Sequence, residues 1–319
     1  MTGAFALPPE TGEFQHPALF YRALDAYVRE TAGFVRDALK VEEPVLVAVP
    51  QPRLDALRQA LGTDAAAVSF ADMTELGRNP GRVLSALGSF ADRHPGRPAR
   101  IVGESIWPGR PPAETVEAVR HEALVNTAFR GRRATVLCPY DIEALPPAVI
   151  ADARRTHPAL IEDGRARTSS AYTDPAAVCA GLDLPLPEPA AAEVRLAYAG
   201  GQLRQVRERA DAWVRGTALA PHRRGDFVIA VNEAAANSLA HGGGSGTLRL
   251  WRTGSGTAVA EIRDGGRLTD LLAGRHCPPL ASSRGGRGLW MIHQLCDLVE
   301  LRTDTAGLTL RLHMRTQDA

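Results

Sequence analysis

The 319-residue sequence is poor in lysine, cysteine and aromatic residues, and it has no long apolar run. Lys40 is the only lysine, so no G-x-x-x-x-G-K-[ST] phosphate loop can form anywhere in the chain. The four cysteines are far apart and form no C-x-x-C pair, so their spacing gives neither a zinc motif nor a disulfide framework. A cytoplasmic protein in a reducing compartment fits this cysteine usage best.

The strongest apolar run, Val45–Val49, is far shorter than the ~20 residues of a membrane span, and the N-terminus lacks a basic region followed by an apolar stretch. We therefore expect no membrane segment. The charges nearly cancel, with Lys+Arg 37 against Asp+Glu 36, which disfavours a charge-driven nucleic-acid partner. Composition is typical of a soluble globular protein, and the length suggests two domains.

A proline-rich segment predicts the domain boundary. Proline at 185, 187 and 189 disfavours helix and favours an extended linker over residues 183–193. The predicted domains are therefore residues 12–182 and 194–316. In the first, apolar runs at 45–49, 67–70, 100–102 and 134–138 alternate with helical patterns at 17–39, 54–61, 83–92 and 115–129. This order predicts a mainly parallel sheet covered on both faces.

The second half has a different order. Helical patterns at 203–214 and 226–240 precede strands at 247–251 and 257–263, a helix at 289–296, and strands at 298–302 and 308–314. Strict alternation in the last strand buries its leucines and places Thr309, Arg311 and His313 on the other face. This half is expected to be an α/β sandwich with one helical layer.

Three polar segments of the second half could carry chemistry. Glu233, Asn237 and His241 recur every fourth residue on one helix face, where a carboxylate and a carboxamide can share Mg²⁺ or polarise a hydroxyl. Three such residues alone are also typical of a solvated helix face. Asp264 is followed by Gly265 and Gly266, which let backbone approach a flat ligand closely while the carboxylate accepts a hydrogen bond from an exocyclic amine.

The third segment is a glycine-rich loop that opens into a helix. It reads Ser283-Arg284-Gly285-Gly286-Arg287-Gly288-Leu289-Trp290. Such a loop presents backbone N–H groups and a helix N-terminus to anions, and Arg284 and Arg287 add positive charge. Taken singly, an Asp-Gly turn and a glycine-rich turn are both ordinary loop features.

The order and spacing of these segments resemble the N, G1 and G2 boxes of the GHKL (Bergerat-fold) ATPases. Residues 203–314 look like the compact branch of that superfamily, the anti-sigma factor serine/threonine kinases. The resemblance implies ATP and Mg²⁺ as cofactors, Glu233 as the base, Asn237 as the Mg²⁺ ligand, and Asp264 at the adenine amine. It also implies that Gly266, Arg284, Gly286, Arg287 and Gly288 belong to the nucleotide site, that Thr309 lies near the adenine, and that residues 267–283 form a short ATP lid.

The resemblance further implies protein partners: a sigma factor, a STAS-type anti-sigma factor antagonist phosphorylated on Ser or Thr, and a second copy of the chain, since relatives often dimerise. Leu268 departs from the D-x-G-x-G form of the G1 box. This departure keeps open a non-catalytic switch that binds a sigma factor in response to ATP. A histidine kinase acting through His121 is a third, weaker hypothesis, because His121 is far from the ATPase half in sequence.

The first half resembles the MEDS sensory domain of actinobacterial regulators. The resemblance is carried by His16-Pro-Ala-Leu-Phe-Tyr21, the 45–49 strand, Trp107-Pro-Gly-Arg-Pro and Leu137-Cys-Pro-Tyr-Asp141. It implies a degenerate RecA-like fold, and without a phosphate loop we expect no ATP site there. His16 and His157 precede prolines and are interpreted as turn residues. Cys138 ends an apolar strand and is interpreted as a small buried residue, although a sensor role stays open.

Overall fold

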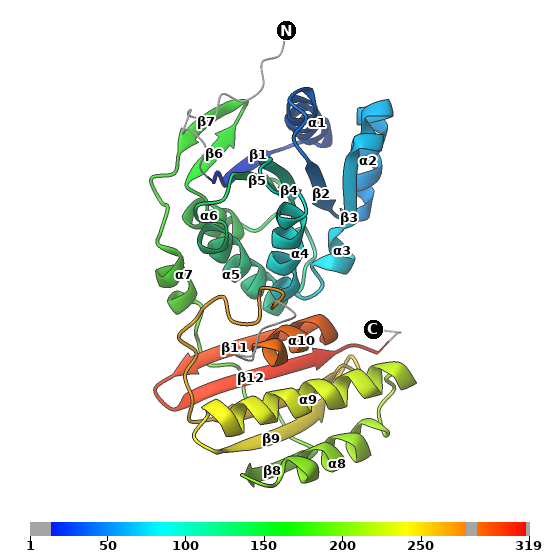
Figure 1. The fold of residues 1–319 in the computed structure, drawn as a ribbon, viewed down its shortest axis with the longest axis vertical. Coiled ribbons are helices and arrows are strands. Elements are labelled where there is room, and N and C mark those ends of the chain that lie inside the picture. The colour runs from blue at the N-terminus through cyan, green and yellow to red at the C-terminus, as the bar shows by residue number, and fades with distance from the viewer. Residues whose placement is uncertain (1–13, 279–285, 317–319) are drawn as a thin grey trace. The chain divides into compact units, whose positions relative to one another are not determined.

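The chain folds as two compact units, Met1–Leu182 and Asp183–Ala319, in a computed structural model that describes residues 14–278 and 286–316 (Figure 1). Each unit has its own sheet and its own helices, so the predicted α/β class is confirmed for both halves. Within the described residues, no helix combines the length and apolar character that crossing a membrane requires.

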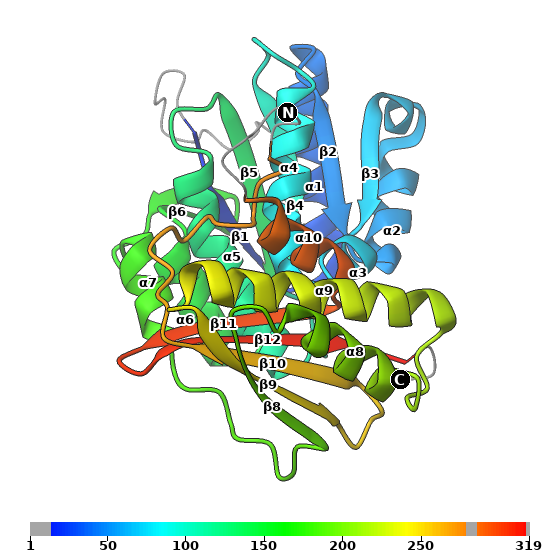
Figure 2. The same cartoon turned by 60° about the horizontal axis from the view of Figure 1, so that its bottom comes forward.

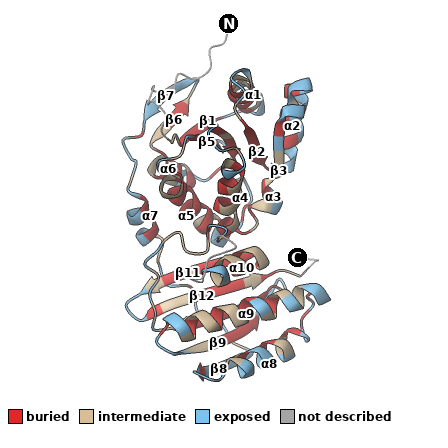
Figure 3. Ribbon diagram, in the orientation of Figure 1, coloured by how far each residue is buried: buried red, intermediate tan, exposed pale blue. Residues whose placement is uncertain are grey.

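The first unit is built on a seven-stranded sheet in the order β3-β2-β4-β5-β1-β6-β7. All neighbouring pairs are parallel except β6 with β7. The strands are β1 (Pro17–Tyr21), β2 (Val45–Val49), β3 (Val68–Asp72), β4 (Ala99–Gly103), β5 (Ala134–Asp141), β6 (Ala159–Glu162) and β7 (Arg165–Thr168). Figure 3 shows that β1, β2, β4 and β5 are almost wholly buried, as expected for a parallel sheet covered on both faces.

Helices cover both faces of this sheet. They are α1 (Leu24–Lys40), α2 (Gln51–Leu61), the 3₁₀ turn η1 (Gly62–Ala67), α3 (Met73–Leu76), α4 (Pro80–Asp92), α5 (Pro112–Ala128), α6 (Pro147–Thr156) and α7 (Pro175–Gly181). The connections through α1 and α2 run toward the β3 edge, and those through α4, α5 and α6 run toward the opposite edge. Because such crossovers are right-handed, the two groups lie on opposite faces.

One element differs from its prediction. The helix expected over residues 17–39 begins only at Leu24, and Pro17–Tyr21 is instead strand β1. This strand pairs in parallel with β5 on one side and β6 on the other, and all five of its residues are buried. A short apolar run fits either a helix or a buried strand, and the two sheet partners decide between them.

The second unit has a five-stranded antiparallel sheet in the order β11-β12-β10-β9-β8. The strands are β8 (Val194–Ala199), β9 (Ser245–Arg252), β10 (Ala258–Asp264), β11 (Leu298–Asp304) and β12 (Gly307–Met314), and the helices are α8 (Leu203–Val214), α9 (Pro221–His241) and α10 (Arg287–Leu295). The edge strand β8 was not predicted.

All three helices lie on one face of this sheet (Figure 2). Phe227, Val231 and Ala235 of α9 pack in the core with leucines of β9 and β12. The predicted sandwich with a single helical layer is thereby confirmed.

The other face of the five-stranded sheet carries a row of alternating charges. Glu261 of β10 is directly opposite Arg249 of β9 and Arg311 of β12, which in turn is opposite Glu300 of β11. Arg249 Nε donates to Glu261 Oε1 at 2.9 Å, and Arg311 Nε donates to Glu261 Oε2 at 2.9 Å. Glu261 is fully buried and the two arginines nearly so. Opposite charges on facing strands stabilise this register.

The proline-rich segment is docked on this charged face. Glu188 accepts hydrogen bonds from Arg249 Nη1 and Arg263 Nη2, both at 2.5 Å, and Pro187 O accepts one from Arg311 Nη2 at 2.8 Å. The hydrogen bonds from Arg249 and Arg263 lower the pKa of Glu188 to about 2. Residues expected to act only as a linker therefore form part of the second unit.

Replacing Glu261 with glutamine tests the charged row. Glu261→Gln leaves buried Arg311 without its anion and Arg249 with Glu188 alone, so we expect the second unit to lose about 3–5 kcal/mol of stability. Three of the four tryptophans, Trp213, Trp251 and Trp290, lie in this unit, so tryptophan fluorescence during urea unfolding reports on it. The control Glu208→Gln removes only an exposed pair with Arg204 and should leave the unfolding midpoint essentially unchanged. Equal midpoints for the two variants would show that the row does not stabilise the fold.

Candidate functional site

The polar face of α9 is the first component of the site. Asn232 Nδ2 donates to Glu233 Oε1 at 3.3 Å, and Asn237 and His241 line a cavity of about 680 Å³. The opposite face of α9 is packed in the core. The predicted four-residue spacing thus places Glu233, Asn237 and His241 on the side of the helix that the core leaves open.

The start of α10 lies against this polar face. A β-carbon added at Gly288 would lie 2.9 Å from Glu233 Oε2 and 3.3 Å from Asn237 Nδ2. Gly286, the N-cap residue, has φ of 87°, a left-handed conformation that favours glycine. The two glycines therefore allow the first turn of α10 to face Glu233 and Asn237.

Asp264, the last residue of β10, is held among glycines at the other end of the cavity. Its Oδ1 accepts a hydrogen bond from Gly266 N at 2.8 Å, and Gly265 N donates to Gly242 O at 3.1 Å, which ties the strand end to the end of α9. A β-carbon at Gly242 or Gly266 would lie 2.5 or 2.8 Å from Asp264 Oδ1. Only glycine at both positions leaves room for this carboxylate.

The cavity between these elements has apolar walls and few polar groups. Leu289, Leu301, Leu308 and Leu310 supply apolar surface, and Asn237, His241 and Asp264 supply polar groups. This composition and size are typical of a site for a flat, partly apolar ligand fixed by a few polar contacts.

Residues 267–278 supply much of the cavity lining and contain no helix or strand. Gly274 packs so closely on α10 that a β-carbon there would lie 2.6 Å from Leu289 Cγ. Arg275 is buried. The pKa of His293 on α10 is lowered well below its usual value, first by the burial of His293 itself and then by the nearby charge of Arg275. Part of the expected lid is therefore anchored to α10, and residues 279–283 lie outside the described residues.

Of the remaining predicted site residues, some line the cavity and others do not. Gly286, Gly288 and Gly266 line the cavity, whereas Arg287 is the first residue of α10, is exposed and is not part of the lining. Arg284 lies outside the described residues.

Thr309 does not line the cavity, although its neighbours Leu308 and Leu310 do. Side chains alternate along a strand, so Thr309 belongs to the charged face, paired in register with Arg263 and Arg302. The expectation that Thr309 lies near an adenine is corrected by this register.

The site has the donors for a hard divalent cation. The carboxylate of Glu233 and the side-chain oxygen of Asn237 both border the space beside Gly288, where a β-carbon would come 2.9 Å from Glu233 Oε2 and 3.4 Å from Asn237 Oδ1. Oxygen donors that leave positions for water and phosphate suit Mg²⁺. The residues present therefore fit a Mg²⁺–nucleotide, with Asn237 as the predicted ligand.

Leu268 also lines the cavity. It occupies the position at which the G1 pattern has a second glycine, so a side chain stands where backbone alone would face the ligand. The structure accommodates it as part of the apolar wall.

Comparison with known families assigns both halves. Residues 15–158 match the family model MEDS, the MEthanogen/methylotroph, DcmR Sensory domain. Residues 190–314 match the histidine kinase-like ATPase domain. No curated protein matches the chain. The chain thus combines a MEDS N-terminal domain with a histidine kinase-like ATPase domain, and the cavity between α9, β10 and α10 lies in the latter.

Closing the space at Gly288 should disable this site. Gly288→Ala places a methyl group against Glu233 and Asn237, so we expect Mg-ATP affinity to fall at least about tenfold, the loss of ~1.4 kcal/mol. The matched control is Gly225→Ala, also in the second unit, where a β-carbon meets nothing within 4 Å. Isothermal titration with Mg-ATP measures both. Unchanged affinity in Gly288→Ala would show that nucleotide does not bind beside this glycine.

Proposed function

We propose that the chain is an ATP-dependent anti-sigma regulator that binds a sigma factor and phosphorylates an anti-sigma factor antagonist on Ser or Thr, under control of its N-terminal domain. The observation that carries the proposal is the approach of Gly288 to Glu233 and Asn237. It brings the carboxylate of Glu233, our proposed base, and the carboxamide of Asn237, our proposed metal ligand, beside the start of α10, where Asn237 and Gly288 line the cavity. The identity of the partners rests on the resemblance of residues 203–314 to anti-sigma factor kinases.

Each group of the site has a role in phosphoryl transfer. Asp264 would accept a hydrogen bond from the adenine amine, and the backbone N–H groups at the start of α10 would donate hydrogen bonds to the phosphates. The hydroxyl oxygen of the antagonist would form a bond to the γ-phosphorus while the bond between that phosphorus and the leaving oxygen of ADP breaks. Glu233 would accept the proton that this hydroxyl loses. Mg²⁺, when bound, supplies charge neutralisation between the phosphates. Because the second unit contains no lysine, Arg284 and Arg287 are the proposed side-chain cations.

A non-catalytic switch is the second hypothesis. Leu268 in the cavity wall favours it, because the glycine pattern of the G1 box is incomplete there. The presence of Glu233 at the phosphate end disfavours it, because a protein that only binds ATP does not need a base. A histidine kinase is less well supported still, since His121 is buried on α5 in the N-terminal unit.

Glu233→Gln separates these hypotheses. The substitution keeps shape and hydrogen bonding but removes the base, so we expect Mg-ATP affinity within about threefold of the parent and phosphate transfer reduced ~10²–10⁴-fold. The assay uses γ-labelled ATP with an antagonist captured from the native cytosol on the immobilised protein. Glu208→Gln, an exposed carboxylate on α8, is the control.

Three other outcomes would contradict the kinase. Transfer undiminished in Glu233→Gln would remove its proposed base. ATP binding with no transfer to any captured partner would favour the switch. Acid-labile phosphate on the protein itself, lost in His121→Gln, would favour the histidine kinase.

A further inference from the structure

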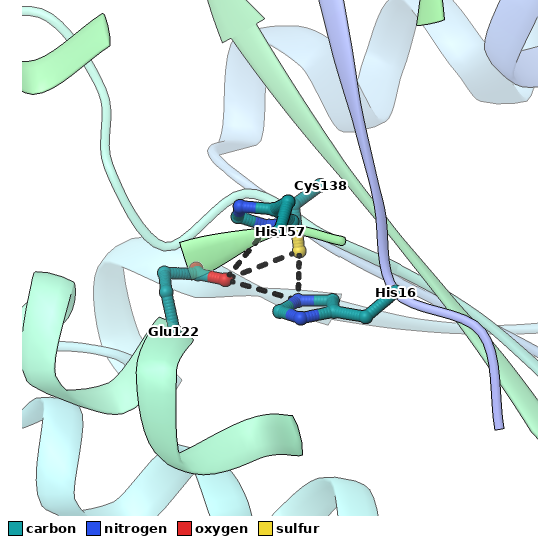
Figure 4. Close-up of side chains that lie close together, drawn as sticks. All are labelled: His16, Glu122, Cys138 and His157. Carbon is teal, nitrogen blue, oxygen red and sulfur yellow. Dashed lines mark hydrogen bonds and ion pairs between the residues drawn. The ribbon is translucent and has the colours of Figure 1, made fainter. Parts of the chain in front are cut away.

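Four side chains that could hold a metal ion meet in the core of the N-terminal unit (Figure 4). They are His16, directly before β1, Glu122 on α5, Cys138 on β5, and His157 between α6 and β6. All four are at least 97% buried. Two of them, His16 and His157, are not the turn residues that their neighbouring prolines suggested, because they point into the core.

Four of the six distances between the donor atoms are those expected around a single small cation. Glu122 Oε2 lies 3.3 Å from His16 Nε2, 3.4 Å from His157 Nε2 and 3.3 Å from Cys138 Sγ. Cys138 Sγ lies 3.4 Å from His16 Nε2, and all donor atoms fall within 4.8 Å of one another. Tetrahedral zinc with its usual bond lengths to N, O and S separates its ligand atoms by about 3.3–3.6 Å.

The second ring nitrogen, Nδ1, of each histidine already forms a hydrogen bond. His157 Nδ1 lies 2.8 Å from Ala153 O, a carbonyl that can only accept, so Nδ1 carries the proton. Asn126 Nδ2 donates to Thr156 O at 2.8 Å, which leaves Asn126 Oδ1 to accept from His16 Nδ1 at 3.1 Å. In the neutral rings both Nε2 lone pairs therefore point at Glu122. Metal-bound histidines are typically oriented by this kind of outer hydrogen bond.

Hydrogen bonding among the described residues does not satisfy the cluster. Glu122 Oε1 and His157 Nε2 are buried and have no hydrogen-bond partner there. A carboxylate facing two ring lone pairs in a dry core is unfavourable unless a cation or an additional proton lies between them. A divalent cation would satisfy all the facing lone pairs at once.

We infer that His16, Glu122, Cys138 and His157 bind one zinc ion in the core of the N-terminal unit. Imidazole and thiolate donors favour zinc over Mg²⁺ or Ca²⁺, and four protein ligands close the coordination sphere, as in structural rather than catalytic zinc sites. The ion joins β1, β5 and the start of β6, three adjacent strands, to α5. Its role is therefore to hold the centre of the sensory domain together.

Metal analysis of the untagged full chain tests the site. Mass spectrometry should find about one zinc per chain, and Co²⁺ added to the chelator-treated protein should give a thiolate-to-cobalt charge-transfer band in the near ultraviolet. Cys138→Ala should abolish the band and leave under about one-tenth of the zinc. Cys179→Ala, the other buried cysteine of this unit, is the matched control and should keep both.

A measurement on the parent protein guards against a variant that does not fold. Chelation should lower the midpoint of thermal unfolding, and added zinc should restore it. A folded parent chain with neither stoichiometric metal nor uptake of zinc or cobalt would overturn the inference, and would show that the four side chains share protons instead. Another transition metal at full occupancy would overturn the assignment to zinc.

Discussion

The close approach of α10 to α9 is the constraint on which the candidate site depends. It is closest at Gly288, where a β-carbon would lie 2.9 Å from Glu233 Oε2, so a side chain there would force this carboxylate to shift. It also requires the left-handed turn at Gly286, which starts the helix in the correct direction. Given both, the positive end of the α10 dipole faces the carboxylate and carboxamide of α9. The phosphates of a bound nucleotide would face the positive end of α10, and their Mg²⁺ would face the side chains of α9.

The same unit separates its polar chemistry onto two faces of one sheet. The helical face encloses the cavity, and the opposite face is occupied by the charged row around Glu261 and by residues 187–188. Alternation along β12 divides the two, with Leu308 and Leu310 at the cavity and Thr309 and Arg311 in the charged face. The arginines there are used for stability, so they are not available to a ligand in the cavity.

The sequence predicted those features that depend on local periodicity. The spacing of Glu233 and Asn237 follows the helical repeat, and the order of the three polar segments placed Asp264 and Gly288 at the same cavity. Features that depend on long-range pairing were missed or assigned wrongly. Strand β1 was predicted as helix because only its partners β5 and β6 distinguish the two. The cluster of His16, Glu122, Cys138 and His157 has no motif spacing, because each residue comes from a different element.

We propose that the cavity between α9, β10 and α10 binds Mg-ATP. An experimental structure of the full chain with Mg²⁺ and a non-hydrolysable ATP analogue tests it most directly. We expect to find the adenine amine at Asp264, the metal at Asn237 and the phosphates at the start of α10. Nucleotide bound in the N-terminal unit, or bound in the cavity with its adenine away from Asp264, would contradict it.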